Sequence, residues 1–178
     1  MKIAIIIGAV VLMLVGIGLQ SVTRDELKWH FVSSGDKAQD YLGYLTSWPD
    51  GRHVSEAKSR YDERSWADAQ AAGTVGAYHG YEQNFPDGAH LMEAQAQVDE
   101  LSWQQASQAN TMESLQGYLK NYGAGKHVNE ANAMIDDLTW QTASQASTME
   151  SLQGYLKNYG AGKHAAEAGA RMDELTWQ

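Results

Sequence analysis

The chain is built on a repeat of 37 residues, and this period constrains its fold more than any other feature. Four residue types recur at this interval without a gap. They occupy the positions Trp29, Trp66, Trp103, Trp140 and Trp177; Tyr44, Tyr81, Tyr118 and Tyr155; Gly51, Gly88, Gly125 and Gly162; and His53, His90, His127 and His164. A fixed period of this length is typical of proteins that stack one supersecondary unit. We therefore expect repeats at 29–65, 66–102, 103–139 and 140–176, of which the last two are identical at 29 of 37 positions.

Each repeat is expected to contain a short helix followed by a long one. Met112, Leu115 and Leu119 recur at the spacing of one helix face. A turn should end the short helix, because residues 48–51 of the first copy read Trp-Pro-Asp-Gly. Residues 127–146 contain neither glycine nor proline and predict a long helix. Since no segment shows a sustained alternation of apolar and polar residues, we predict an all-α fold with an α-solenoid-like array of four helix pairs over residues 29–178.

The start of each short helix is expected at a capping box. In this motif a side chain at the first position and a glutamate three residues later bind exposed backbone N–H groups. Ser147 and Asn110 are each followed by glutamate at this spacing. Asp36 and Gly73 occupy the same position in the earlier copies and also suit a helix cap.

The N-terminal segment differs from the rest of the chain. Residues 3–19 contain no polar or ionisable side chain. At about 1.5 Å per residue, a helix extended to residue 22 would span about 30 Å, the thickness of a bilayer core. We predict a transmembrane helix over about 3–22, with residues 1–28 as membrane anchor and neck; a cleaved signal peptide is the alternative. The predicted membrane-anchor residues are Ile3, Ile7, Val11, Val15 and Leu19.

Two further expectations concern this membrane segment. Ala4 and Gly8 form a small-xxx-small pair, which predicts a contact with another helix in the membrane; an ordinary lipid-facing helix is the alternative. Lys2 precedes the apolar run, and a short basic N-terminus usually stays on the cytoplasmic side. The expected localisation is therefore the bacterial inner membrane, with a single pass and a periplasmic repeat domain.

The repeat also carries a family resemblance. Residues 44–57 follow the pattern Y-L-x-x-(W/F/Y)-P-x-G-x-H-x-x-E-A. This pattern resembles the tetratricopeptide-like repeats of bacterial envelope proteins. It departs from the standard tetratricopeptide unit, which has 34 residues and a different opening motif. The resemblance covers residues 29–177 and implies an interaction scaffold that performs no chemistry.

The sequence offers one candidate for a metal site, the recurring His-x-x-Glu. Its two side chains share a helix face, but equivalent positions of stacked helices lie about 10 Å apart. A zinc ion needs its nitrogen ligands at about 2.0–2.1 Å, so one ion cannot serve two copies. The paired carboxylates, such as Asp136-Asp137, are expected on a solvated face. We therefore predict no catalytic, cofactor-binding or metal-binding residues.

The aromatic residues are the candidates for binding. The tryptophans are either fillers between stacked helices or a stripe that binds ligand. Tyrosine is common at interfaces because it is amphipathic. The predicted partner-binding residues are Tyr118, Tyr122, Tyr155, Tyr159 and Trp177. Trp177 should either fold back on the fourth repeat or be covered by a partner.

These observations together predict a non-catalytic, membrane-anchored helical-repeat scaffold. We expect an accessory or stabilising subunit of a larger membrane complex, with the other protein subunits and the bilayer (through residues 3–22) as its partners. The alternative is an envelope binding module that recognises peptidoglycan or another glycan through aromatic stripes. A net charge of -9 argues against nucleic acid as a partner, because its phosphates require a basic surface.

Overall fold

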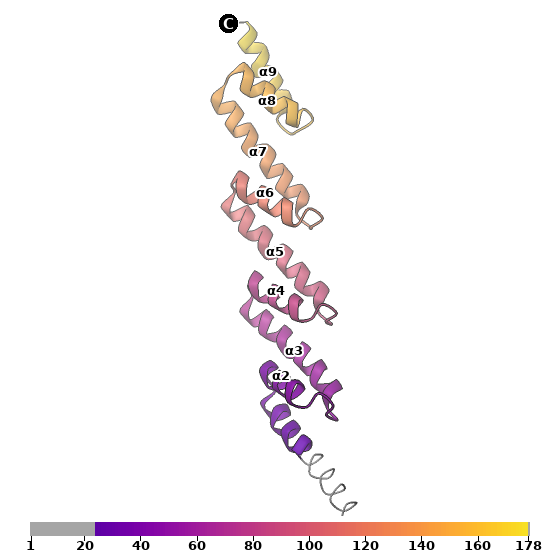
Figure 1. Ribbon diagram of the computed structural model, residues 1–178. Helices are drawn as coiled ribbons and strands as arrows, with labels where there is room; N and C mark the ends of the chain where they lie inside the picture. The colour runs from indigo at the N-terminus through magenta and orange to yellow at the C-terminus, as the bar shows by residue number, and fades with distance from the viewer. Residues whose placement is uncertain (1–23, 178) are drawn as a thin grey trace, which may run out of the picture. The chain divides into compact units, whose positions relative to one another are not determined.

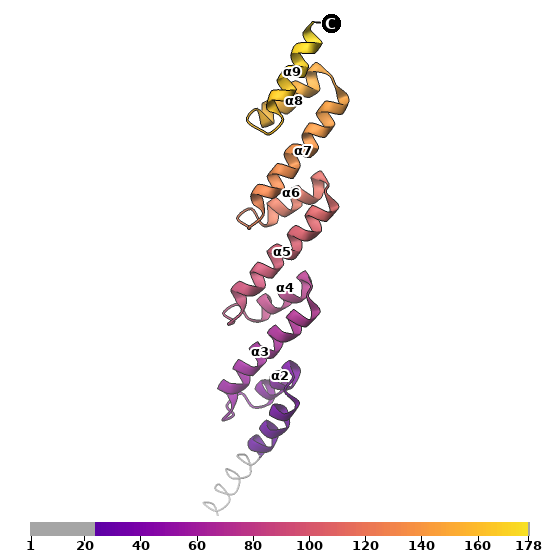
Figure 2. The same ribbon diagram turned by 180° about the vertical axis from the view of Figure 1, so that it is seen from behind.

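The computed structural model describes residues 24–177, and all regular structure in this part of the chain is helical. Long and short helices alternate along it (Figure 1; Figure 2 gives the view from behind). Residues 24–35 form a first helix. The others are α2 (Ala38–Ser47), α3 (Val54–Ala72), α4 (Val75–Asn84), α5 (Leu91–Ala109), α6 (Met112–Asn121), α7 (Val128–Ala146), α8 (Met149–Tyr159) and α9 (Ala165–Thr176). The predicted all-α class is confirmed.

The chain divides into two compact units with a boundary between Gln95 and Ala96. In the first unit, one cluster joins the first helix, α2 and α3, and its buried members are Val32, Tyr41, Tyr44 and Ala57. In the second unit, one cluster joins α5, α6 and α7, and another joins α7, α8 and α9. Their buried members are Ala106, Leu115, Tyr118, Ala131 and Ile135 in the former and Trp140, Ala143, Leu152, Tyr155 and Ala168 in the latter.

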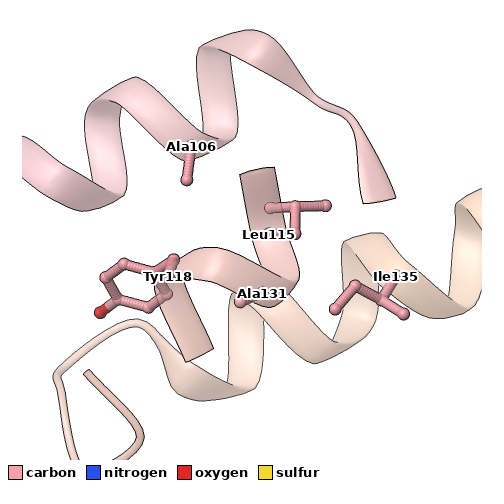
Figure 3. Packing of buried hydrophobic residues seen from close by; sticks show 5 residues of the cluster. All are labelled: Ala106, Leu115, Tyr118, Ala131 and Ile135. Carbon is pink, nitrogen blue, oxygen red and sulfur yellow. The ribbon is translucent and has the colours of Figure 1, made fainter. Parts of the chain in front are cut away.

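Alanine on the long helices lets the short helices approach closely. Figure 3 shows Leu115 and Tyr118 on α6 between Ala106 of α5 and the α7 residues Ala131 and Ile135. Ala131 and Leu115 have no exposed surface, so a larger residue at Ala131 would displace the short helix. Each helix pair therefore buries a small number of side chains, which agrees with the weakly apolar composition of the repeat.

The helix caps lie one residue away from their predicted positions. Ser147, Asn110, Gly73 and Asp36 are not N-caps; each has a positive φ of 46–58° in the link between a long helix and the next short helix. The N-cap is the following residue, as at Thr148, whose hydroxyl accepts the N–H of Ser151. The left-handed conformation explains the choice of glycine, asparagine and aspartate at this position, since these residues tolerate it best.

The predicted transmembrane helix requires correction. Between residues 24 and 177, no helix is both long and apolar enough to cross a bilayer. The predicted span at about 3–22, with its anchor residues and the Ala4–Gly8 pair, lies outside the described residues. The fold class is accordingly corrected to all-α without the transmembrane helix, and the predicted single-pass inner-membrane localisation is not supported.

The left-handed residue before each N-cap can be tested directly by substitution. Ser147 has φ 49°, so Ser147→Gly removes backbone strain and should raise the free energy of unfolding by about 1 kcal/mol. The reverse substitution, Gly73→Ser, should lower the free energy of unfolding by a similar amount, because Gly73 has a φ of 58° and serine is strained there. A steric clash adds nothing to this loss, since a Cβ at Gly73 meets only the Gln70 carbonyl, at 3.7 Å. Urea unfolding followed by circular dichroism measures both changes. Equal stability of the two variants would contradict the assignment.

Candidate functional site

A hydrogen-bonded group occurs four times at the 37-residue period, and its centre is an aspartate on the helix that precedes each short helix. A tyrosine hydroxyl from the next short helix donates to one oxygen of this carboxylate. The distances are 2.5 Å for Tyr44 to Asp25, 2.6 Å for Tyr118 to Asp99 and 2.5 Å for Tyr155 to Asp136, and Tyr81 binds Asp62 in the same way. We call each aspartate–tyrosine pair, with the turn that it binds, a latch.

The second carboxylate oxygen binds the turn after the short helix. A backbone N–H donates to it at 2.9–3.1 Å in all four copies, from Arg52, Ala89, Lys126 and Lys163. In three copies the tyrosine hydroxyl also accepts a hydrogen bond from the backbone N–H of the recurring histidine, which follows the turn. The N–H of His127, for example, donates to the Tyr118 hydroxyl at 3.3 Å. One carboxylate therefore ties together a long helix, the following short helix and the turn between the short helix and the next long helix.

The recurring glycine is required by this approach of side chains to the turn. A Cβ placed on Gly125 would lie 2.7 Å from the Tyr118 hydroxyl, and one on Gly162 would lie 2.7 Å from Asp136 Oδ2. These separations are closer than van der Waals contact permits. Any other residue would push the turn away from the latch.

The recurring histidine is also used inside the repeat. Its ring stacks on the tryptophan of the preceding long helix, with centroids 4.6 Å apart for Trp29–His53 and 5.3 Å for Trp140–His164. Its Nε2 faces the second carboxylate of the acidic pair, at 3.0 Å for His127 and Glu100. The histidine thereby covers one face of the indole ring and pairs with an acid at the surface.

The latch shifts the titration of its members. Burial, and then the hydrogen bond to the carboxylate, raises the pKa of Tyr44, Tyr81, Tyr118 and Tyr155 to about 12. Burial alone would raise the pKa of Asp25, but the Tyr44 hydroxyl and the Arg52 N–H outweigh it, so the net pKa is lowered. At the surface, the hydrogen bond from His127 lowers the pKa of Glu100 to about 2.

These contacts leave the group little capacity for chemistry. A tyrosine with a pKa of about 12 is a poor source of tyrosinate, and the latch carboxylates are filled by donors. His90 is bracketed by two carboxylates, with Nδ1 2.6 Å from Glu93 and Nε2 3.6 Å from Glu63. Within residues 24–177, no three histidine or acidic side chains gather in a way that could hold a metal ion.

The five predicted partner-binding residues differ widely in their exposure to solvent. Tyr118 and Tyr155 are 3% and 1% exposed and belong to latches, so their rings are not accessible to a partner. Tyr122 and Tyr159 are half-buried and stack on them. Trp177 is 90% exposed, so it does not fold back on the fourth repeat.

The predicted solvated face of paired carboxylates is partly wrong. In the four pairs that form latches, the first acid points inward, and Asp25 and Asp136 are buried, whereas the second acid stays near the surface. The pair Asp173-Glu174 is exposed, as predicted. The structural role of the four latch aspartates was not predicted, although the sequence contains a signal for it. They recur every 37 residues, always 19 positions before the latch tyrosine and 26 before the glycine.

No protein-family model matches the chain, and no curated protein is significantly similar to it in sequence.

Removing one latch hydroxyl should destabilise the chain. Tyr155→Phe takes a donor from the buried carboxylate of Asp136 and should lower the free energy of unfolding by about 1–3 kcal/mol. Tyr159→Phe is the matched control, because this half-buried tyrosine lies on the same helix and its hydroxyl forms no side-chain hydrogen bond within the described residues. Chemical denaturation measures both. Equal losses would show that the latch contributes nothing specific.

The latch tyrosines also predict an alkaline limit of stability. In the unfolded chain a tyrosine ionises near its usual pKa of 10, whereas in the fold the four latch tyrosines ionise at about 12. The unfolded state therefore loses these protons first, so this stability is complete below pH 10 and is lost as the pH rises through 12. Tyrosinate absorbance should rise together with the loss of helical circular dichroism. Ionisation of all tyrosines near pH 10 in a chain that stays helical would contradict the assignment.

Proposed function

We propose that the chain is a non-catalytic helical-repeat scaffold that binds another protein through the surfaces of its short helices. The observation that carries the proposal is a repeated groove beside a glycine that has no packing role. Two equivalent grooves, 37 positions apart, lie between a long helix and the following short helix. Each is described within its own unit.

The groove of the second unit lies between α5 and α6. Gln105, Asn121 and Tyr122 line it, together with the latch tyrosine of that repeat. The groove of the first unit lies between α3 and α4, with Asp68, Asn84 and Phe85 at the equivalent positions. Each groove thus combines an amide, an aromatic ring and a second polar group. This mixture suits a protein segment, which presents both apolar side chains and backbone hydrogen-bonding groups.

The short helices carry glycine in their interiors next to these grooves. A Cβ on Gly80 or Gly117 would meet nothing within 4 Å. Glycine inside a helix costs about 0.5–1 kcal/mol relative to alanine, and packing within the described residues gives no reason for it. Close approach of a partner's backbone over the groove supplies such a reason.

The alternative, a glycan-binding module, needs free indole faces. Stacked histidine covers one face of Trp29, Trp66, Trp103 and Trp140, and Trp66 and Trp140 are only 7% exposed. These contacts favour the tryptophans as core residues. The protein-binding scaffold is therefore the function that we propose.

The open glycines provide the test of this proposal. Gly80→Ala combined with Gly117→Ala should stabilise the chain by about 1–2 kcal/mol in total, because alanine favours the helix. The same variant should retain less of the native partner, because a methyl group at Gly80 lines the first groove and one at Gly117 lies on α6 beside the residues that line the second. Mild purification followed by mass spectrometry identifies the co-migrating chain, and urea unfolding measures the stability.

Gly169→Ala is the matched control. Gly169 lies inside α9, and a Cβ there also meets nothing within 4 Å. It should stabilise the chain in the same way and leave the partner bound. Migration of the wild-type chain as a free monomer would contradict the scaffold, and a partner equally retained by all variants would contradict binding through the grooves.

A further inference from the structure

His90 differs from the three other recurring histidines in the charges around it. In the other copies a basic residue directly precedes the histidine, and these residues are Arg52, Lys126 and Lys163. Each pairs with the acid that its neighbouring histidine faces, at distances of 3.1–3.8 Å. The second copy has Ala89 at this position. Within the described residues, the acid that faces His90 therefore forms no ion pair with a lysine or an arginine.

Two carboxylates approach the two ring nitrogens of His90. Glu93, in the first turn of α5, lies 2.6 Å from Nδ1, and Glu63 of α3 lies 3.6 Å from Nε2. Since an ionised carboxylate only accepts hydrogen bonds, the proton of the neutral ring lies on Nδ1. Nε2 then faces a carboxylate as a bare acceptor, and this buried nitrogen has no hydrogen-bond partner among the described residues.

A second proton on the ring removes this conflict. The imidazolium donates from both nitrogens, so Nε2 gains an N–H for Glu63. Trp66 adds a cation–π attraction, because its ring lies parallel to that of His90 within 7°, with centroids 5.0 Å apart. The N-terminus of α5 opposes a positive charge, but its dipole is equivalent to only about half an elementary charge. The two carboxylates therefore outweigh it.

The other titratable groups beside the ring, Tyr81 and Asp62, are engaged in the latch. The Tyr81 hydroxyl accepts the backbone N–H of His90 at 3.1 Å and donates to Asp62. The second oxygen of Asp62 accepts the N–H of Ala89 at 3.0 Å. Both groups therefore bind the backbone of the turn and leave the ring to the two glutamates.

The arginines of α3 are paired with other acids. Arg64 forms an ion pair with Asp36, and Arg60 lies 3.9 Å from Glu56. Neither forms an ion pair with Glu63, although both lie within a few positions of it on the same helix. The charges that act on His90 are therefore mainly negative.

We propose that His90 is a proton-binding site that tightens the junction of α3 and α5 as the pH falls from about 8 to about 6. The bound proton supplies the N–H that joins the ring to Glu63, while Glu93 holds the other nitrogen. The second repeat would thus become more stable in mildly acidic surroundings. This site is independent of the proposed scaffold function.

The sign of the effect follows from the surroundings of the ring. Burial alone would lower the pKa of His90, but the hydrogen bond to Glu93 and the charges of Glu93 and Glu63 outweigh it, so the pKa is raised above its ordinary value of 6.5. The folded chain therefore binds this proton more tightly than the unfolded chain. The stability that it contributes is complete below pH 6.5 and is lost as the pH rises through the raised pKa.

Ala89→Lys restores the basic residue of the other copies and tests the site directly. The side chain of Ala89 is exposed and only its backbone N–H binds the latch, so the variant should fold. In a nuclear magnetic resonance titration of the full chain, the midpoint of His90 should lie above 6.5. Ala89→Lys should lower this midpoint by about half a pH unit, as expected for one added charge near the surface. Glu63→Gln should lower it as well.

Urea unfolding at about pH 8 and at about pH 6 gives the second readout. The wild-type chain should unfold at a higher urea concentration at the lower pH, and this gain should shrink in Ala89→Lys and Glu63→Gln. Comparison with the wild type removes the effect of the other histidines, which all these chains share. Gln83→Lys is the matched control, because it adds the same charge on α4, where the later copies carry Lys120 and Lys157. It should leave both readouts unchanged.

A midpoint of His90 at or below 6.5 would overturn the proposal. A midpoint that neither Ala89→Lys nor Glu63→Gln moves would do the same, because the acids and the absent base would then not control the proton. An equal shift in Gln83→Lys would show that net charge alone is responsible, which also contradicts the site. A raised midpoint without any gain in stability at the lower pH would overturn the tightening of the junction.

Discussion

The hydrogen bonding of each latch carboxylate, which is buried in two copies and half-buried in the other two, is the interaction on which the arrangement of the helices depends. A charged group inside a protein is unfavourable unless its acceptor positions are filled. The tyrosine hydroxyl fills one oxygen of Asp136 and the turn N–H of Lys163 fills the other. The carboxylate is therefore satisfied only when the long helix, the short helix and the turn have reached their places together. The apolar contacts around it are small, because alanine occupies the crossing points of the helices.

The same dependence explains which sequence predictions were correct. Helices and turns follow from apolar spacing, proline and glycine, and these local rules placed both elements of each repeat. The caps were misplaced because two registers satisfy the capping pattern. Ser147 and Thr148 each precede a suitable residue by three positions, and only the backbone angle, with φ 49° at Ser147, distinguishes them. That angle depends on how the two helices pack, which one repeat read in isolation does not contain.

The candidate site was harder to predict for a related reason. Adjacent acids on a helix point about 100° apart, so one member of a pair can be buried while the other remains at the surface. Asp136 and Asp137 divide in this way. Tyr155 and Tyr159 likewise lie on one face of α8, but only Tyr155 lies beside an aspartate of the preceding helix. What distinguishes the latch residues from their neighbours is their contacts with residues 19 and 27 positions away, such as those of Tyr155 and Lys163 with Asp136. Helix periodicity does not reach across such spacings.

The latch also has a consequence for how the chain folds. Its longest hydrogen bond in sequence, such as that from Lys126 to Asp99, joins residues only 27 positions apart. Closing so short a loop costs little chain entropy, and proteins dominated by contacts of this range fold quickly. Folding can begin in any copy and spread to its neighbours. A nascent chain can complete its first latch once residue 53 has emerged from the ribosome, before the later copies have emerged.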